Sequence, residues 1–315
     1  MQNIIKYLLF LSITCLCMFS LKYFYEKRAK DLYIDKPSYV ISCKNNNFDY
    51  VVGGSSRVHN NFNSPLFDSL CGVNGFNIGN GGSALCQNYL TLYMFLKNGN
   101  KIKTYIQQVE DNFLMDPKKA FTYPFQDYFF MPYIGDETVD ECFKSSVSLT
   151  KFYIWKFIPF IKYAEFNNYY SFNKILHPTV VDKDVLKLKG YSKLQTLHVD
   201  GFPLKIYQRT EEIPVDASNI FYLNKIRNLC LDNNINFIIY SSPVYQKNYL
   251  VNKQPKLHAG LMDYIKNNKV KYFNFMLDKR YENDSLFYDE THLNSMGTDL
   301  FIAQLSDSLK TILKQ

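Results

Sequence analysis

The chain has 315 residues, of which 47% are hydrophobic and 17% aromatic. This composition supports a sizeable core and excludes the disordered class, and the length fits one large domain or two small ones. The formal net charge of +7 comes from lysines that are scattered rather than gathered in a basic stripe, so we expect no nucleic-acid partner.

The N-terminal segment is strongly apolar. Residues 7–21 carry no charged side chain, and aromatic residues follow Lys22. Snorkelling by Lys22 extends this run toward the roughly 20 residues that a membrane span needs. We therefore expect an uncleaved transmembrane anchor at residues 1–25. A cleaved signal peptide, for which a small-residue cleavage site is missing, and a buried helix are the alternatives.

Five of the seven cysteines lie beyond the apolar segment, at irregular spacing and without a C-x-x-C pair. This pattern argues against zinc sites and thioredoxin-like sites. We expect neither a metal nor a cofactor.

Beyond residues 26–47, which we interpret as a linker, short apolar runs rich in β-formers alternate with helical patterns. The expected strands are 48–54, 76–82, 101–109, 235–244 and 270–276, and the expected helices lie within 83–100, at about 217–233 and 257–268, and from about 295. Continuous apolar strands that alternate with helices indicate a parallel sheet covered on both faces. We predict a doubly wound, flavodoxin-like α/β domain with five strands over residues 48–315.

Residues 113–215 interrupt this alternation with dense aromatic runs. The segment is too long for an ordinary loop, so we interpret it as an inserted cap or subdomain. Three interpretations of its aromatic side chains are open: they pack on the main core, they line a substrate lid, or they form a membrane-surface patch. Trp155 is of a type that stacks on sugar rings.

Several reactive residue types follow expected strands. Ser55 and Ser56 come after two glycines at the end of the first strand, and Asp289 and His292 follow the last strand. Ligands bind at the carboxyl ends of the strands in such sheets, so we expect these side chains at one edge. A serine nucleophile needs a histidine base, and the histidine needs a carboxylate that fixes its tautomer. His59, His177, His198 and His258 lack acidic residues at useful spacing, and we interpret them as structural or solvated.

The sequence blocks around these residues resemble the SGNH (GDSL-like) hydrolase superfamily. They are Gly54-Ser55-Ser56-Arg57, Asn77-x-Gly79-x-x-Gly82, Asn112 and Asp289-x-x-His292-Leu293-Asn294. The resemblance implies that Ser56 is the nucleophile, that Asp289 and His292 complete a catalytic triad, and that Gly82 and Asn112 donate to the oxyanion. The third block departs from the family pattern, because Glu110 and Phe113 stand where Gly and a second Asp are usual.

The Gly-Ser-Ser form is similar to membrane-anchored acyl-transfer relatives that help to D-alanylate teichoic acids or acetylate exported polysaccharides. The resemblance therefore implies acyl transfer to, or ester hydrolysis on, a cell-surface carbohydrate, with an extracytoplasmic domain and a membrane protein as acyl donor. The positively charged residues that follow the span argue against that orientation. A degenerate domain that binds glycans or an assembly partner, and a soluble-type esterase for small esters, are the alternatives.

A different interpretation comes from Gly79-x-Gly81-x-x-Ala84, which lies between an expected strand and helix and mimics a dinucleotide fingerprint. That fingerprint needs an acidic residue about 20 positions on, whereas Glu110 lies 26 positions after Ala84. It also leaves Ser56 and the Asp–His block without a role.

Overall fold

The computed structural model describes residues 2–32, 35–114, 127–178, 182–195, 215–246 and 255–314. The chain divides into two compact units. Unit 1 comprises Met1–Ser42 and Tyr123–Val181, and unit 2 comprises Cys43–Thr122 and Asp182–Gln315.

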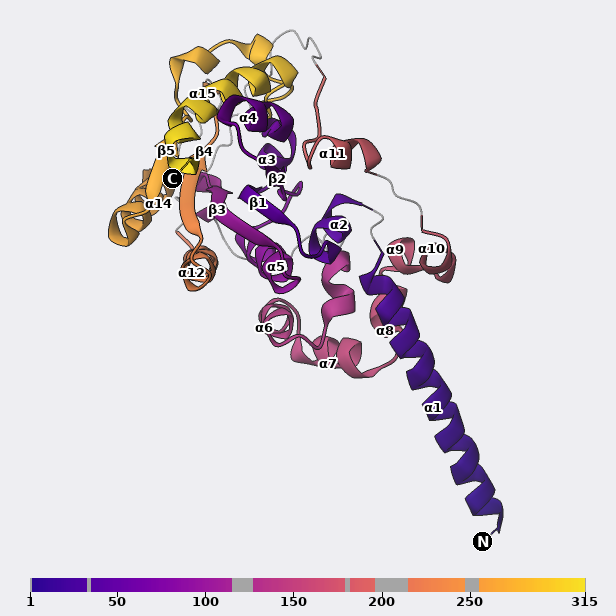
Figure 1. Ribbon diagram of the computed structural model, residues 1–315. Coiled ribbons are helices and arrows are strands. Elements are labelled where there is room, and N and C mark those ends of the chain that lie inside the picture. The colour runs from indigo at the N-terminus through magenta and orange to yellow at the C-terminus, as the bar shows by residue number, and fades with distance from the viewer. Residues whose placement is uncertain are drawn as a thin grey trace. The chain divides into compact units, whose positions relative to one another are not determined.

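Unit 2 is built on a five-stranded sheet in which all neighbouring strands are parallel (Figure 1). The spatial order is β2 (Gly75–Asn77), β1 (Asn47–Gly53), β3 (Lys101–Gln108), β4 (Asn236–Ser241) and β5 (Lys271–Asn274). The strand order reverses between β1 and β3, which is the switch point where doubly wound folds place their ligands. The predicted α/β fold class with a five-stranded parallel sheet is therefore confirmed.

Helices cover both faces of this sheet. Those described in unit 2 are α3 (Ser56–Asn61), α4 (Ser64–Cys71), α5 (Leu85–Lys97), α11 (Lys183–Lys187), α12 (Ala217–Asp232), α14 (Pro255–Asn268) and α15 (Ser295–Leu313), with 3-10 turns η1 (Asp111–Leu114), η4 (Lys279–Tyr281) and η5 (Asp284–Leu286). Helix α15 packs against α3 and α4, whereas α12 packs against α5. Alternate strand residues Tyr50 and Val52 join Phe301 and Leu305 of α15 in one core, because successive side chains of a strand point to opposite faces.

Unit 1 is helical in its described part. Its elements are α1 (Gln2–Lys30), α2 (Lys36–Ser42), η3 (Tyr128–Tyr133), α6 (Glu137–Ser146), α7 (Leu149–Phe157), α8 (Ile161–Glu165), α9 (Asn167–Tyr170) and α10 (Phe172–Leu176). Trp155 is buried, and its indole N–H donates to Glu165 over 2.9 Å. Its ring therefore packs inside unit 1 and is not available to stack on a sugar.

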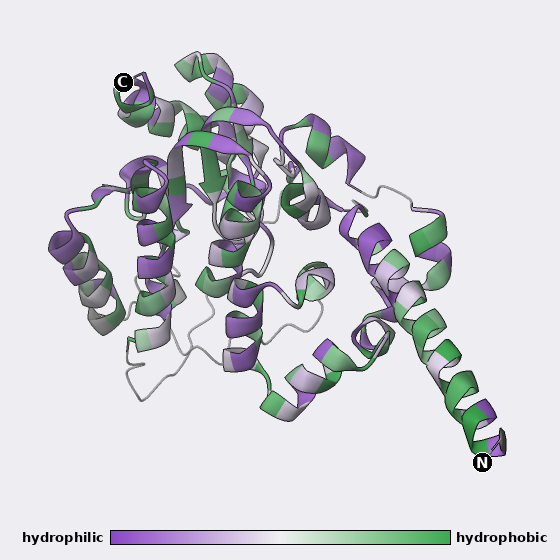
Figure 2. Ribbon diagram, turned by 60° about the horizontal axis from the view of Figure 1, so that its bottom comes forward, coloured by the Kyte–Doolittle hydropathy of each residue, from purple (hydrophilic) through white to green (hydrophobic). Residues whose placement is uncertain are grey.

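Helix α1 changes character along its length (Figure 2). Residues 3–21 are almost entirely exposed although most of them are apolar, whereas Lys22, Tyr25 and Arg28 contact other parts of unit 1. The exposed part rises about 28 Å at ~1.5 Å per residue, close to the ~30 Å hydrocarbon thickness of a bilayer. By length and composition, Asn3–Lys30 is able to cross a membrane.

The units do not follow the predicted domain limits residue by residue. The segment 26–47, expected as a linker, contains the end of α1 and all of α2. Of the expected insertion, 113–215, residues 123–181 fall in unit 1 and α11 falls in unit 2. The stretches 115–126, 179–181 and 196–214 of that insertion lie outside the described residues.

Candidate active site

The loop after β1 forces a sharp change of direction. Gly54 has a backbone φ of +157°, and a Cβ there would collide with a methyl group of Val58. Only glycine tolerates both conditions without strain. Ser55 then accepts hydrogen bonds at its carbonyl from the N–H groups of Val58 and His59, at 3.0 Å each. Ser56 is consequently the first residue of α3, directly beyond the carboxyl end of β1.

The short helix α3 is held in place by Asn77, the last residue of β2. The buried Asn77 amide donates to the carbonyls of Val58 at 2.6 Å and Phe62 at 3.1 Å, and its side-chain oxygen accepts from the N–H of Gly79 at 2.9 Å. A helix of six residues has little stability of its own, so these tertiary hydrogen bonds fix its orientation.

The loop that carries Asp289 and His292 is closed at both ends. Phe287 and Leu293 form an isolated antiparallel bridge, and the backbone N–H of Tyr288 donates to the carbonyl of His292 over 2.8 Å. Asn294 caps α15 by accepting from the N–H of Gly297 at 3.1 Å, and its amide donates to the carbonyl of Ser285 at 2.6 Å. The loop is therefore tied to the start of the last helix.

The three residues predicted as a triad lie in hydrogen-bond contact. The Ser56 Oγ lies 2.8 Å from His292 Nε2, and His292 Nδ1 lies 2.9 Å and 3.0 Å from the two oxygens of Asp289. A carboxylate beside Nδ1 assigns the ring proton to that nitrogen, which leaves Nε2 to accept from the serine hydroxyl. This arrangement has the geometry that a serine nucleophile and its general base require.

Asp289 is kept ionised by its neighbours. Partial burial by itself would raise the pKa of this carboxyl, but hydrogen bonds from His292 and Thr291 outweigh that effect and hold the pKa well below its usual range. The Thr291 N–H, the Thr291 hydroxyl and the His292 N–H all donate to Oδ1, at 2.7–2.8 Å. These bonds also fix the direction in which the carboxylate faces the imidazole.

The residues expected to bind an oxyanion differ in how the structure places them relative to Ser56. Ser56 opens a helix, and the first N–H groups of a helix have no intrahelical acceptor. Gly82 is an exposed turn residue with φ of +69°, whereas a Cβ on the preceding Gly81 would lie 4.0 Å from Ser56 Cβ. Gly81 is thus the glycine seen next to the nucleophile, and the role of Gly82 stays a prediction. Asn112 belongs to η1, but its side chain lies outside the described structure.

A buried charged network lies next to Ser56, and its members are too far apart in the chain for local spacing to indicate it. Arg57 forms an ion pair with Glu110, and Glu110 Oε1 accepts from the Gln108 amide and the Ser242 hydroxyl at 2.7 Å each. The Arg57 and Glu110 side chains are only 12% and 4% exposed. Desolvation lowers the pKa of Arg57 to about 10, although the negative charge of Asp289 raises it in part. Glu110 and Ser242 are far apart in sequence and meet only because β3 and β4 are adjacent.

One of the histidines interpreted as structural or solvated has an acidic partner after all. His258 of α14 lies 3.2 Å from Asp111 Oδ1, which is buried in η1. The two residues are 147 positions apart, so no local spacing indicates the pair. Within the described ranges, no group of three His, Cys, Asp or Glu side chains is arranged to hold a metal ion.

Comparisons with known proteins add little to this geometry. Neither a family model nor a curated protein matches the sequence. Among solved structures, the chain is similar to a crystal structure described as that of a candidate acylhydrolase from Bacteroides fragilis. The two share 12% sequence identity over 84% of this chain and 87% of the other, with a TM-score of 0.40. A likeness at this level says nothing about activity.

Proposed function

We propose that the chain is a serine-dependent acyl-ester enzyme that works through an acyl-enzyme on Ser56. The observation that carries this proposal is the continuous contact from Ser56 Oγ through the His292 ring to the Asp289 carboxylate. Such a chain is what acyl transfer needs.

The chemistry proceeds in two balanced steps. Ser56 Oγ attacks the ester carbonyl while His292 Nε2 takes its proton, and collapse of the tetrahedral intermediate releases the alcohol, which receives that proton. A water molecule or an acceptor hydroxyl then attacks the acyl-enzyme, again with His292 as general base, and regenerates Ser56. Asp289 stabilises the imidazolium in both steps. In this proposal the N–H of Ser56 and a glycine N–H of the 81–82 turn stabilise the oxyanion, with Asn112 as a third donor.

For the substrate, we favour a carbohydrate at the cell surface, either as acyl acceptor or as the ester to be hydrolysed. The support is the apolar helix α1, which is long enough to keep the chain at a membrane. Acyl carriers and nascent surface glycans are found there. The proposal includes an active site on the extracytoplasmic side and a membrane protein as acyl donor. Two other functions compete with it, a glycan-binding domain without catalysis and an esterase for small esters.

The test uses a fluorophosphonate probe, which forms a covalent bond only with an activated serine. We compare the wild-type chain with Ser56→Ala and with the matched control Ser55→Ala. Each variant lacks one hydroxyl of the wild type. We expect labelling of the wild type and of Ser55→Ala, with the adduct mapped to Ser56, and none of Ser56→Ala. An unlabelled wild-type chain that remains folded would support the binding-domain alternative.

A second experiment decides what the acyl group reacts with. An acyl donor is incubated with the enzyme in the presence and absence of a surface glycan, and the acyl group is followed by mass spectrometry. Transfer to the glycan, abolished in Ser56→Ala, is the expected result. Rapid hydrolysis of the donor that an added glycan does not reduce would show that the chain is an esterase for small esters.

A further inference from the structure

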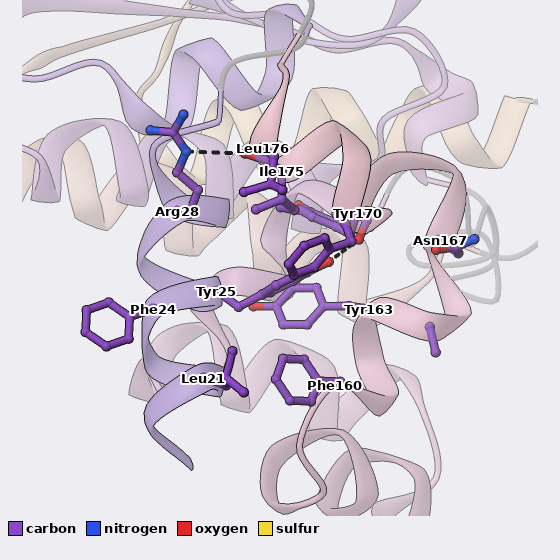
Figure 3. Close-up of a pocket in the computed structure, with 12 residues that line it drawn as sticks. Leu21, Phe24, Tyr25, Arg28, Phe160, Tyr163, Asn167, Tyr170, Ile175 and Leu176 are labelled. Atoms are coloured by element: carbon purple, nitrogen blue, oxygen red, sulfur yellow. Dashed lines mark hydrogen bonds between the residues drawn. The ribbon is translucent and has the colours of Figure 1, made fainter. Parts of the chain in front are cut away.

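Unit 1 contains a pocket of about 570 Å³, and all the residues that line it belong to that unit. One wall is the end of α1, with Leu21, Tyr25 and Arg28, and the other is formed by α8 to α10 (Figure 3). The volume falls within the range of about 300–1,000 Å³ typical of small-molecule sites. It would hold an acyl chain of on the order of 20 carbons, if a methylene fills the ~30 Å³ of a water molecule.

The walls are apolar and reach the surface. Phe24, Phe172 and Leu176 line the pocket and are 66%, 63% and 51% exposed, whereas Tyr163 and Tyr170 form a buried floor. Large apolar side chains that line a hollow and also face outward are typical of a site that receives an apolar ligand. Because exposed residues 3–21 of α1 run directly into this wall, the source of such a ligand is the membrane that α1 is able to cross.

Polar groups in the pocket are few and are ordered along its length. Arg28 is the charged residue among those that line it, and its Nε donates to the carbonyl of Ile175 at 3.3 Å (Figure 3). Leu21 lies seven residues earlier on the same face of α1, about 10 Å nearer the apolar end at ~1.5 Å per residue. A cation at the outer end and an aliphatic side chain at the membrane end match the polarity of a lipid standing in a leaflet.

A third group lies between these ends. The Tyr163 hydroxyl is buried and has no hydrogen-bond partner among the described residues. Its ring packs against Tyr25, with 4.9 Å between the ring centroids, so it is level with the middle of the α1 wall. In Figure 3 the hydroxyl points from α8 toward α1. A buried hydroxyl without a partner is unfavourable. Because the Tyr163 hydroxyl has almost no accessible surface, a ligand carbonyl would pair with it after a small shift of the ring.

We propose that this pocket binds one glycerophospholipid, with an acyl chain between α1 and α8, an ester carbonyl on Tyr163 and the anionic headgroup at Arg28. The order of the three features along α1 follows the order of chain, ester and phosphate in the lipid. The inference is independent of the proposed catalytic function, because none of its residues belongs to unit 2. It predicts a lipid that stays with the chain when α1 is removed from the bilayer.

The experiment uses the full chain in nanodiscs of phosphatidylcholine and phosphatidylglycerol that contain a phosphatidylglycerol with a photoactivatable diazirine in one acyl chain. Cross-links along residues 3–21 are expected for any spanning helix and serve as the internal reference. The result expected for a bound lipid is additional cross-linking to Phe160, Tyr163 or Ala164. Cross-links confined to α1 would overturn the proposal.

Matched variants separate the pocket from the general membrane surface. Ala164 is an exposed wall residue, so Ala164→Trp fills the pocket, whereas Asn173→Trp adds the same ring to an exposed position that does not line it. We expect Ala164→Trp to lower the pocket cross-links at least tenfold relative to the reference, and Asn173→Trp to leave them unchanged. If Ala164→Trp fails to fold, the wild-type cross-link map still decides the question.

Two further pairs test the polar contacts. Arg28→Gln should reduce the preference for phosphatidylglycerol over phosphatidylcholine roughly fivefold, whereas Lys27→Gln, which removes an exposed charge one position earlier, should not. Tyr163→Phe should reduce lipid retention several-fold while leaving the lipid-free protein as stable or more stable. Added inorganic phosphate should not displace the lipid, because the acyl chain supplies most of the binding. Displacement by phosphate would show an anion site instead.

Discussion

Replacing Gly54 by alanine is the substitution for which the structure gives the clearest expected magnitude. A Cβ at Gly54 would collide with Val58 Cγ2 and lie 3.0 Å from Gln108 Cβ, in a backbone conformation with φ of +157°. Overpacking of this kind costs roughly 1–3 kcal/mol and the glycine-only conformation about 1–3 kcal/mol. Together they predict a loss of about 2–6 kcal/mol in the free energy of unfolding of unit 2.

Gly72 offers a matched control. Its φ of +70° is also in the left-handed region, but a Cβ there would meet nothing within 4 Å. Gly72→Ala therefore carries only the conformational cost, about 1–2 kcal/mol. The additional loss in Gly54→Ala measures the collision with α3. A double variant with Val58→Ala, which removes the colliding methyl group, should lose less stability than the sum of the two single variants.

The assay must report on unit 2 alone. The single tryptophan, Trp155, belongs to unit 1, so its fluorescence is a control for that unit. Cys71, Cys86 and Cys230 are buried in unit 2, and pulsed alkylation of these thiols in increasing urea follows its unfolding. Equal urea midpoints for Gly54→Ala and Gly72→Ala, or strict additivity in the double variant, would refute the close packing of Gly54 on α3.

Three other substitutions test the site electrostatics and its supporting loop. Because the pKa of Asp289 is lowered in the folded chain, its contribution to stability is complete above the ordinary carboxyl pKa of ~3.9 and declines below it. The melting-temperature gap between wild type and Asp289→Asn should thus be constant near neutral pH and shrink in acid, and a gap that widens in acid would contradict this. Glu110→Ala leaves the charge of Arg57 buried without its ion-pair partner, so thiol alkylation should show a loss of about 3–5 kcal/mol, whereas a neutral effect would exclude a buried pair. Asn294→Ala removes a helix cap worth about 0.5–2 kcal/mol and a tie to the Asp289 loop, so fluorophosphonate labelling of Ser56 should slow together with that loss, and unchanged labelling would separate the cap from the site.

Much of unit 2 was determined by local sequence. The runs around residues 48–54, 101–109 and 235–244 contain consecutive apolar residues, Val51-Val52, Tyr105-Ile106 and Ile238-Ile239, and a strand buried on both faces requires such neighbours. The predicted strands and helices agree with the structure to within a few residues, except that the second strand ends at Asn77, well before residue 82. Residues 79–82 are glycine-rich, and glycine is unfavourable in a strand. The contact between Ser56 and His292 also followed from sequence, because parallel strands bring their carboxyl ends to one edge.

Only the tertiary structure decided the contacts between residues that no local pattern links. Glu110 pairs with Arg57, and Asp111 with His258, because adjacent strand ends and a distant helix converge there. Gly81 lies beside Ser56, a contact that the spacing of the glycines in the sequence does not reveal. The lipid-sized pocket likewise depends on helices about 140 residues away from α1. Periodicity records which face of an element is buried, but the partner of a buried polar group is chosen by the packing of the whole chain.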